Sequence, residues 1–246
     1  MAPENTMAAF RAARDLGADG VELDVQPSAD GELVVIHDVT LDRTTSGSGN
    51  VFQADWTQLR SLDAGSWFSP THRGERVPRL GDVLQLEELR FEVELKGYGA
   101  RFLENVLRTV IDAGVLGRVE FTSFNVPLLL QLKELEPSAQ IGLFSQPQQA
   151  WMDDDAFEHV IVGLAATSGF DVAHVHARSI TPSIVDRLHQ LGMVAHANDA
   201  ISGRDVQRAI ESGVDRLTIK DPTIARQALT GHVAPHRGVS EASYVK

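Results

Sequence analysis

Apolar residues along the chain follow two alternating periods. Short extended runs such as "GVELDV" (20–25) alternate between apolar and charged residues, and longer stretches with helical spacing follow them. A first helix is expected to begin near Pro3 and to end at Gly17. The later helices are expected at about 101–113, 126–135, 150–166, 182–191, 203–212 and 222–230. Such regular alternation predicts parallel strands joined by crossover helices.

The count of main strands falls one short of a closed barrel. The expected strands are "GVELDV", "EVELK", "VEFTS", "IGLFS", "VAHVH", "VAHAN" and "DRLTI", with "LVVIHD" continuing the first unit. A (β/α)8 barrel needs eight strands, so either the sheet is open and doubly wound or another segment supplies a strand. The C-terminal "HVAPHRG" (232–238) follows the last helix and has an apolar lead-in. We therefore expect an α/β protein, and this C-terminal segment is the candidate first strand that would make it a TIM (β/α)8 barrel rather than an open sheet.

Residues 39–80 interrupt the alternation, after the second extended run. This segment is rich in glycine and proline but also carries Phe52, Trp56 and Trp67. A polar linker would not carry such rings, so an ordered insertion is expected here. The length of 246 residues suits one large domain, and we expect residues 1–246 to form a single barrel domain with an insertion at 39–80.

Charged residues alternate with apolar ones on two of the expected strands. The period of two places Glu22 and Asp24 on one face of the first strand, and Glu92, Glu94 and Lys96 on one face of a later one. In an isolated strand this would be a solvated face, but a parallel sheet covered by helices has none. Buried carboxylates cost several kcal/mol each when unpaired. Glu22, Asp24 and Glu94 therefore form a candidate all-oxygen site for a hard cation, Mg2+ or Ca2+.

One histidine is expected at the end of the barrel where chemistry takes place. His37 ends "LVVIHD", and an imidazole at the carboxyl end of a strand can give or take a proton near neutral pH. The alternative is a structural histidine. His174, His176 and His196 also lie on late strands, so residue type alone does not single out His37.

Composition narrows the classes of partner and compartment. A net charge of −12 argues against non-specific nucleic-acid binding, which needs a basic surface. No apolar run is long enough to span a membrane and no leader is visible, so stable membrane insertion is not expected. The absence of cysteine excludes disulfides and fits a cytoplasmic enzyme. The oligomeric state cannot be read from the sequence.

Several motifs, spread over nearly the whole chain, resemble the glycerophosphodiester phosphodiesterase family. They are "PENTMAAF", "GADGVELDVQPSADGELVVIHDVTLDRTTSGSG", "LRSLDAGSWF", "GERVPRL", "VELK", "TSFN" and "GVDRLTIKDP". The resemblance implies a TIM barrel that uses a divalent metal to hydrolyse glycerophosphodiesters, small-molecule substrates, to an alcohol and glycerol 3-phosphate.

The resemblance also implies roles for individual residues. The metal-binding carboxylates fall on Glu22, Asp24 and Glu94, the second of two catalytic histidines on His37, and the phosphate-contacting lysine on Lys96. The metal and Lys96 would supply cationic charge to the phosphate, and two histidines would divide the acid and base roles.

The first catalytic histidine of the family belongs to a His-Arg-Gly motif that this chain lacks near its N-terminus. His236 and Arg237 in "HVAPHRGVSE" are the favoured substitutes, as in a circularly permuted barrel. His72 also precedes an Arg-Gly pair, but that segment matches another family motif. The alternative is a disordered tail on a truncated, inactive barrel.

The late strand Ala195-His196-Ala197-Asn198 departs from the Trp-Thr-Val-Asn common in the family. The resemblance as a whole still implies glycerophosphodiester hydrolysis as the expected activity. A vestigial metal-binding barrel and a phosphodiesterase for lysophospholipid-type substrates remain as alternatives.

Overall fold

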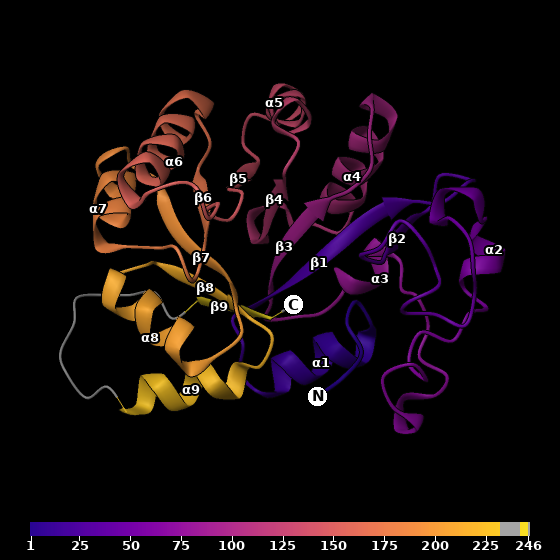
Figure 1. Cartoon of the computed structure of the whole chain (residues 1–246). Coiled ribbons are helices and arrows are strands. Elements are labelled where there is room, and N and C mark those ends of the chain that lie inside the picture. Colours follow the sequence, from indigo (N-terminus) through magenta and orange to yellow (C-terminus); the bar gives the residue numbers. More distant parts are fainter. Residues whose placement is uncertain (232–241, 246) are drawn as a thin grey trace.

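Eight parallel strands form the closed barrel that the sequence predicts. The structure is a computed structural model that describes residues 1–231 and 242–245 (Figure 1). The barrel strands, in the order in which they pair, are β1 (Gly20–Pro27), β3 (Arg90–Leu95), β4 (Val119–Ser123), β5 (Gln140–Phe144), β6 (Val172–His176), β7 (Val194–Ala200), β8 (Arg216–Ile219) and β9 (Ala242–Val245). Parallel pairing of β9 with both β8 and β1 closes the ring.

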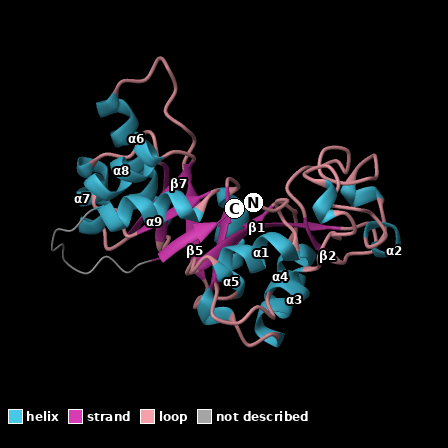
Figure 2. Ribbon diagram, turned by 90° about the horizontal axis from the view of Figure 1, so that it is seen from below, coloured by secondary structure: helices cyan, strands magenta, loops and turns pink. Residues whose placement is uncertain are grey.

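Helices surround the strands, as Figure 2 shows from below. They are α4 (Ala100–Asp112), α5 (Val126–Leu135), α6 (Asp154–Ser168), α7 (Pro182–Gln190), α8 (Gly203–Ser212) and α9 (Pro222–Gly231), together with the short η3 (Leu116–Arg118) before β4. These bounds agree with the expected helices to within a few residues. Their apolar faces pack on the outward side chains of the strands, such as Val21, Leu23 and Val93, in one continuous core.

The first helix begins later than the sequence suggested. Helix α1 spans Met7–Asp15 rather than starting near Pro3. Thr6 is its N-cap, and the Thr6 side chain accepts a hydrogen bond from the Ala9 amide. Asn5 has a left-handed backbone with φ of 54°, which a helix does not accommodate. Residues 3–6 are therefore outside the helix and can serve the barrel mouth.

Strand β2 (Leu33–Val35) pairs with β1 in the antiparallel sense and lies outside the barrel ring. The insertion after it contains η1 (Val51–Gln53), α2 (Trp56–Leu59) and η2 (Pro70–His72), and α3 (Leu80–Val83) follows it. Among the described residues between the insertion and β3, the short α3 is the one helix. A separate apolar cluster that includes Val34, Val51 and Leu59 holds the insertion together, so it is ordered, as its aromatic residues predicted.

The prediction that the C-terminal segment supplies the missing strand is confirmed. The strand spans Ala242–Val245. It lies later in the chain than residues 232–238, where the apolar lead-in had suggested it. Tyr244 is opposite Thr218 on β8 and Gly20 on β1. His236 and Arg237 lie outside the described residues.

Candidate active site

Three buried carboxylates lie together in the barrel interior. Glu22 and Asp24 are on β1 and Glu94 is on β3, and the parallel register places Asp24 directly beside Glu94. One oxygen from each of the three lies within 4.8 Å of the others, and all three residues are buried. Three such carboxylates repel one another unless cations are close. Their all-oxygen donor set fits a hard divalent ion, so the described residues contain a group able to hold a metal.

Lys96 directly follows β3 and brings a positive charge to this group, which we call the carboxylate cluster (Glu22, Asp24 and Glu94). Its Nζ is 2.8 Å from Glu94 Oε1 and 3.2 Å from Asp24 Oδ1. Burial alone would lower the pKa of Lys96, but the two carboxylates outweigh burial and raise it above its ordinary value. The ammonium therefore stays charged at neutral pH. Its side chain is 20% exposed, so it can still reach a ligand at the mouth.

The antiparallel turn of β2 brings His37 to the same end of the barrel. The Ile36 amide donates to the carbonyl of Asp24, which fixes the chain one residue before His37 at the level of the carboxylate cluster. Gln26 Nε2 donates to the carbonyl oxygens of Ile36, His37 and Asp38 at 2.9, 3.1 and 2.8 Å. The expected position of His37 is thus reached, although β2 runs opposite to the barrel strands.

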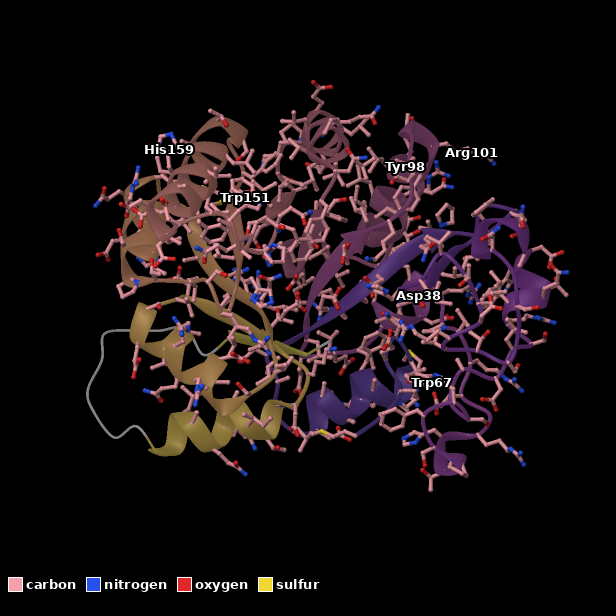
Figure 3. All side chains as sticks on the ribbon, in the orientation of Figure 1. Asp38, Trp67, Tyr98, Arg101, Trp151 and His159 are labelled. Atoms are coloured by element: carbon pink, nitrogen blue, oxygen red, sulfur yellow. The ribbon has the colours of Figure 1, made fainter. Side chains whose placement is uncertain are left out.

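A chain of charged residues orients the His37 ring. His37 Nδ1 is 2.7 Å from Asp38 Oδ1, and Asp38 accepts two hydrogen bonds from Arg43. Arg43 also donates to both carboxylate oxygens of Glu4 at 3.0 and 2.6 Å. The Arg43 hydrogen bonds, with a smaller effect of His37, hold the pKa of Asp38 far below its usual range. Asp38 is therefore an anion at any physiological pH; Figure 3 shows it between β1 and the insertion.

Sequence reasoning assigned no role to these orienting residues. Asn5 is one of them: its Nδ2 donates to Asp24 Oδ2 at 2.7 Å, and its Oδ1 accepts from the Asp24 amide at 3.2 Å. Glu4 and Asn5 belong to "PENT", and Asp38 and Arg43 belong to "HDVTLDRTT". These residues were present in the quoted motifs. Their orienting role becomes visible only in the fold, which brings the two motifs into contact.

An aromatic border lies at or just past the carboxyl ends of β3, β4 and β5. Glu94 pairs with Thr122, and Lys96 and Phe124 follow directly after the ends of β3 and β4. Phe124 stacks on Phe144 with ring centroids 4.9 Å apart. Phe124 is 49% exposed, and Tyr98 and Trp151, in the loops after β3 and β5, are more exposed (Figure 3).

A second polar group lies below the carboxylate cluster, inside the barrel. We call it the interior cluster; its members are Glu92, Glu120, His174, His196, Arg216 and Thr218. His174 Nε2 is 2.5 Å from Glu120 Oε1, and Arg216 donates to the other oxygen of Glu120 at 2.5 Å. Gly142 makes room for this pair, since a Cβ atom there would clash with Glu120 and lie 2.6 Å from His174 Nε2.

The histidines of the interior cluster differ in their electrostatics. Burial lowers the pKa of His174, but the carboxylates of Glu92 and Glu120 outweigh it, so the net shift is upward. Burial, with the charges of His174 and Arg216, holds the pKa of His196 well below its ordinary value. The sequence predicted that both histidines lie on late strands. It did not reveal that they lie close to Glu92 and Glu120.

The structure thus brings Glu22, Asp24, Glu94 and Lys96 together and places His37 at the same end of β1. His72 instead ends η2 in the insertion, where its ring packs edge-on against Phe68 at 5.5 Å. That the His-Arg-Gly at His72 is coincidental stays a prediction. His236 and Arg237 remain predictions. Within the described residues, no helix is both long and apolar enough to cross a membrane.

Comparison with known proteins places this geometry in a family. The model of the glycerophosphoryl diester phosphodiesterase family matches residues 1–223. A glycerophosphodiester phosphodiesterase of Caldanaerobacter subterraneus subsp. tengcongensis is 34% identical over 228 residues, which cover 89% of each chain.

Solved structures of glycerophosphodiester phosphodiesterases and a related phosphodiesterase are also similar to this chain. The crystal structure of a glycerophosphodiester phosphodiesterase from Agrobacterium tumefaciens is 27% identical with a TM-score of 0.79, and the match covers 92% of this chain and 94% of that one. An Oleispira antarctica phosphodiesterase in complex with the product sn-glycerol-3-phosphate is 26% identical with a TM-score of 0.74, over 93% and 92% of the two chains. The chain therefore belongs to the glycerophosphoryl diester phosphodiesterase family, and its enzyme class is that of a glycerophosphodiester phosphodiesterase.

Proposed function

We propose that this enzyme hydrolyses glycerophosphodiesters to an alcohol and glycerol 3-phosphate in a metal-dependent reaction, with histidines as general acid and base. The observation that carries the proposal is the carboxylate cluster with Lys96 and His37 at one end of β1 and β3. The Oleispira antarctica relative was solved with sn-glycerol-3-phosphate, the product expected here. The proposal includes a cytoplasmic location.

Glu22, Asp24 and Glu94 would hold the divalent cation, Mg2+ or Ca2+. When bound, the cation supplies positive charge to the non-bridging oxygens of the phosphodiester. The Lys96 ammonium lies on the same carboxylates and would contact a phosphate oxygen from the side of β3. These charges stabilise the negative charge that builds up on the phosphate during attack.

His37 is proposed as one of two proton-transfer groups. Its Nδ1 contacts Asp38, whose lowered pKa keeps the carboxylate ionised near neutral pH, so proton exchange with substrate takes place at Nε2. The attacking group is a water molecule, or a neighbouring glycerol hydroxyl that first forms a cyclic phosphodiester, which water then opens to give glycerol 3-phosphate. Its proton passes to one histidine while the other protonates the alcohol oxygen as the P–O bond breaks. His236 is proposed as the partner of His37, with Arg237 on the phosphate, in line with the His-Arg-Gly motif of the family.

Hydrolysis of glycerophosphocholine in the presence of Mg2+ or Ca2+ tests this function. Wild-type enzyme should release glycerol 3-phosphate, and a chelator should abolish the reaction. His236→Ala should lose activity, whereas the matched control His72→Ala should retain it. Full activity in His236→Ala would remove the C-terminal motif from the mechanism. A wild-type protein that binds the metal but shows no turnover would establish the vestigial barrel instead.

The aromatic border favours a second candidate substrate, a lysophospholipid-type diester. Phe124 and Lys96 lie just past the carboxyl ends of the neighbouring strands β4 and β3, and the half-exposed Phe124 ring stacks on Phe144. An apolar group attached to a phosphate at Lys96 could lie on this surface.

Comparison of Phe124→Ala with Phe52→Ala tests the candidate, because Phe52 is an equally exposed ring in the insertion. A selective fall in kcat/KM for lysophosphatidylcholine over glycerophosphocholine in Phe124→Ala alone would support it. Equal effects on both substrates would exclude it.

A further inference from the structure

Two polar residues lie at the barrel mouth on the side opposite the carboxylate cluster. In the closed ring of strands, β6 and β7 are four places away from β1 and β3. His176 on β6 pairs with Asn198 on β7, two residues beyond the pair of His174 and His196 that lies inside the barrel. Because side chains alternate between the two faces of a strand, His176 and Asn198 also belong to the inner face.

The stagger of the strands places this pair at the height of the carboxylate cluster. The hydrogen-bonded register leads from Asp24 through β3, β4 and β5 to Val172 on β6. It descends as it goes, because continuing it around the ring returns to β1 about eight residues before Asp24. Halfway around, the same height therefore lies about four residues beyond Val172, at His176. A substrate whose phosphate is held at the carboxylate cluster has His176 across from it.

Asn198 carries a buried acceptor without a partner. The residue is 6% exposed, and no hydrogen bond from the described residues reaches its Oδ1. Its Nδ2 donates to Asp199 Oδ2 at 3.4 Å, which orients the amide. Asp199 has a left-handed backbone with φ of 57°, and the register of β7 with β8 shifts between Ala197 and Ala200. Irregularities of this kind re-aim side chains beside functional sites, and a ligand that donates to Oδ1 would satisfy the buried acceptor.

His176 supplies the complementary donor. The Arg178 amide donates to His176 Nδ1 at 3.2 Å, so the proton of the imidazole is on Nε2. The turn after β6 holds the residue in place, because the amides of Ser179 and Ile180 donate to the His176 carbonyl at 2.8 and 3.1 Å. The side chain is partly exposed at the mouth, and no described residue accepts from Nε2. The Nε2–H group can therefore donate to a ligand.

We propose that His176 and Asn198 form a diol subsite that binds the two free hydroxyls of the glycerol arm. One hydroxyl accepts from His176 Nε2–H, and the other donates to Asn198 Oδ1. This inference rests on the proposed function and deepens it, because it fixes the direction of each arm of the phosphodiester. The glycerol arm points toward β6 and β7, and the leaving alcohol lies against the aromatic border at β3, β4 and β5. An acyl chain on either hydroxyl would remove one of these bonds, so the subsite favours fully deacylated diesters over lysophospholipid-type ones.

Calorimetric binding of product-like monoesters tests the subsite without turnover. Wild-type protein in excess Mg2+ is titrated with glycerol 3-phosphate and, separately, with propyl phosphate, which has the same phosphate but no hydroxyl. Wild type should bind glycerol 3-phosphate at least about tenfold more tightly, because two hydrogen bonds are made only with the diol.

Variants assign this preference to the two residues. Asn198→Leu and His176→Phe keep the approximate shape of each side chain and should each lose most of the preference, with affinity for propyl phosphate within about twofold of wild type. The retained affinity for propyl phosphate also shows that each variant folds. His189→Phe is the matched control, because His189 is an exposed histidine of α7 that contacts Asp215, and it should keep the wild-type preference.

Two results would overturn the proposal: wild-type protein that binds glycerol 3-phosphate no more tightly than propyl phosphate, or an unchanged preference in a folded Asn198→Leu or His176→Phe variant. The second would assign the preference to contacts of the hydroxyls elsewhere at the mouth. Wild-type protein with the expected preference but no hydrolysis of glycerophosphocholine would remove the proposed activity and leave the diol subsite standing.

Discussion

Glu94 and Glu92 are two residues apart on one face of β3, yet they belong to different environments. Glu94 lies with Asp24 and Lys96 at the mouth, where the lysine is still partly exposed. Glu92 lies deeper, among buried histidines and a threonine from the far side of the barrel. At the mouth, like charges gather where a ligand can neutralise them; inside, the charges contact protein partners. We therefore expect the residues at the mouth to serve the reaction and the interior cluster to serve stability.

The largest effect should follow a change at the mouth. Glu94→Gln removes one carboxylate from the proposed metal-binding group and one contact of Lys96, so kcat should fall about 100- to 1,000-fold. Because the change also relieves repulsion among carboxylates, the melting temperature should change little. Steady-state kinetics and calorimetry on the same sample check both parts. A large loss of stability with normal kcat would reverse the assignment of the two regions.

A change in the interior should have the opposite outcome. Arg216→Met removes the guanidinium from Glu120 and leaves a carboxylate buried without it, which costs about 3–5 kcal/mol in the free energy of unfolding. Denaturant unfolding measures this cost.

The control for this variant is Arg187→Met. The Arg187 contact with Glu158 is 3.0 Å long, but the arginine side chain is 44% exposed, so the change should cost at most about 1 kcal/mol. Equal losses in the two variants would show that the interior cluster adds no special stability.

Asp38→Asn tests the orientation of His37 and should lower kcat about tenfold, equivalent to about 1.4 kcal/mol. The amide weakens the contacts with His37 and Arg43. Because the pKa of Asp38 is lowered, its ionic contacts are present above the ordinary carboxyl pKa and are lost only as pH falls through the lower folded value. The reduction should therefore be uniform from about pH 5 to pH 9. Asp82→Asn, in the exposed pair with Arg79, should leave kcat unchanged; a pH-dependent reduction in Asp38→Asn would contradict this account.

The smallest effect on turnover is expected from Thr218→Val, which keeps the shape of the side chain but removes the hydroxyl between His196 and Glu92. Loss of these buried hydrogen bonds should cost about 1–3 kcal/mol of stability, with kcat within about twofold of wild type. Thr109→Val, which breaks only a bond to a backbone oxygen within α4, is the matched control. A change in kcat with unaltered stability would connect the interior cluster to turnover.

Hydrophobic periodicity predicted seven of the eight barrel strands, most helix bounds and the shared face of Glu22 and Asp24. The closed barrel was expected only once the C-terminal segment and the family motifs were added. Periodicity could not predict the antiparallel direction of β2, because a three-residue strand has no direction signal of its own. Helix α1 begins late because a local cap at Thr6 and the left-handed Asn5 override the helical pattern.

The side-chain partners were beyond the sequence for a different reason. The period of two assigns His174 to the interior of the barrel but says nothing of its contact with Glu120, 54 residues earlier. Asp38 and Arg43 lie within quoted motifs, yet their link to Glu4 depends on how the loop after β2 meets the residues before α1. Pairing across a barrel is set by register and shear, which no single strand encodes.

Gly142 carries a consequence for the evolution of this barrel. A side chain there would occupy the space of the bond between His174 and Glu120, so these three positions cannot drift independently. A lineage that acquires a larger residue at position 142 must first lose the bulky pair, and one that acquires the pair must already have the glycine. Across homologous sequences, the residues at positions 120, 142 and 174 should therefore change together, even though the three positions are far apart in the sequence.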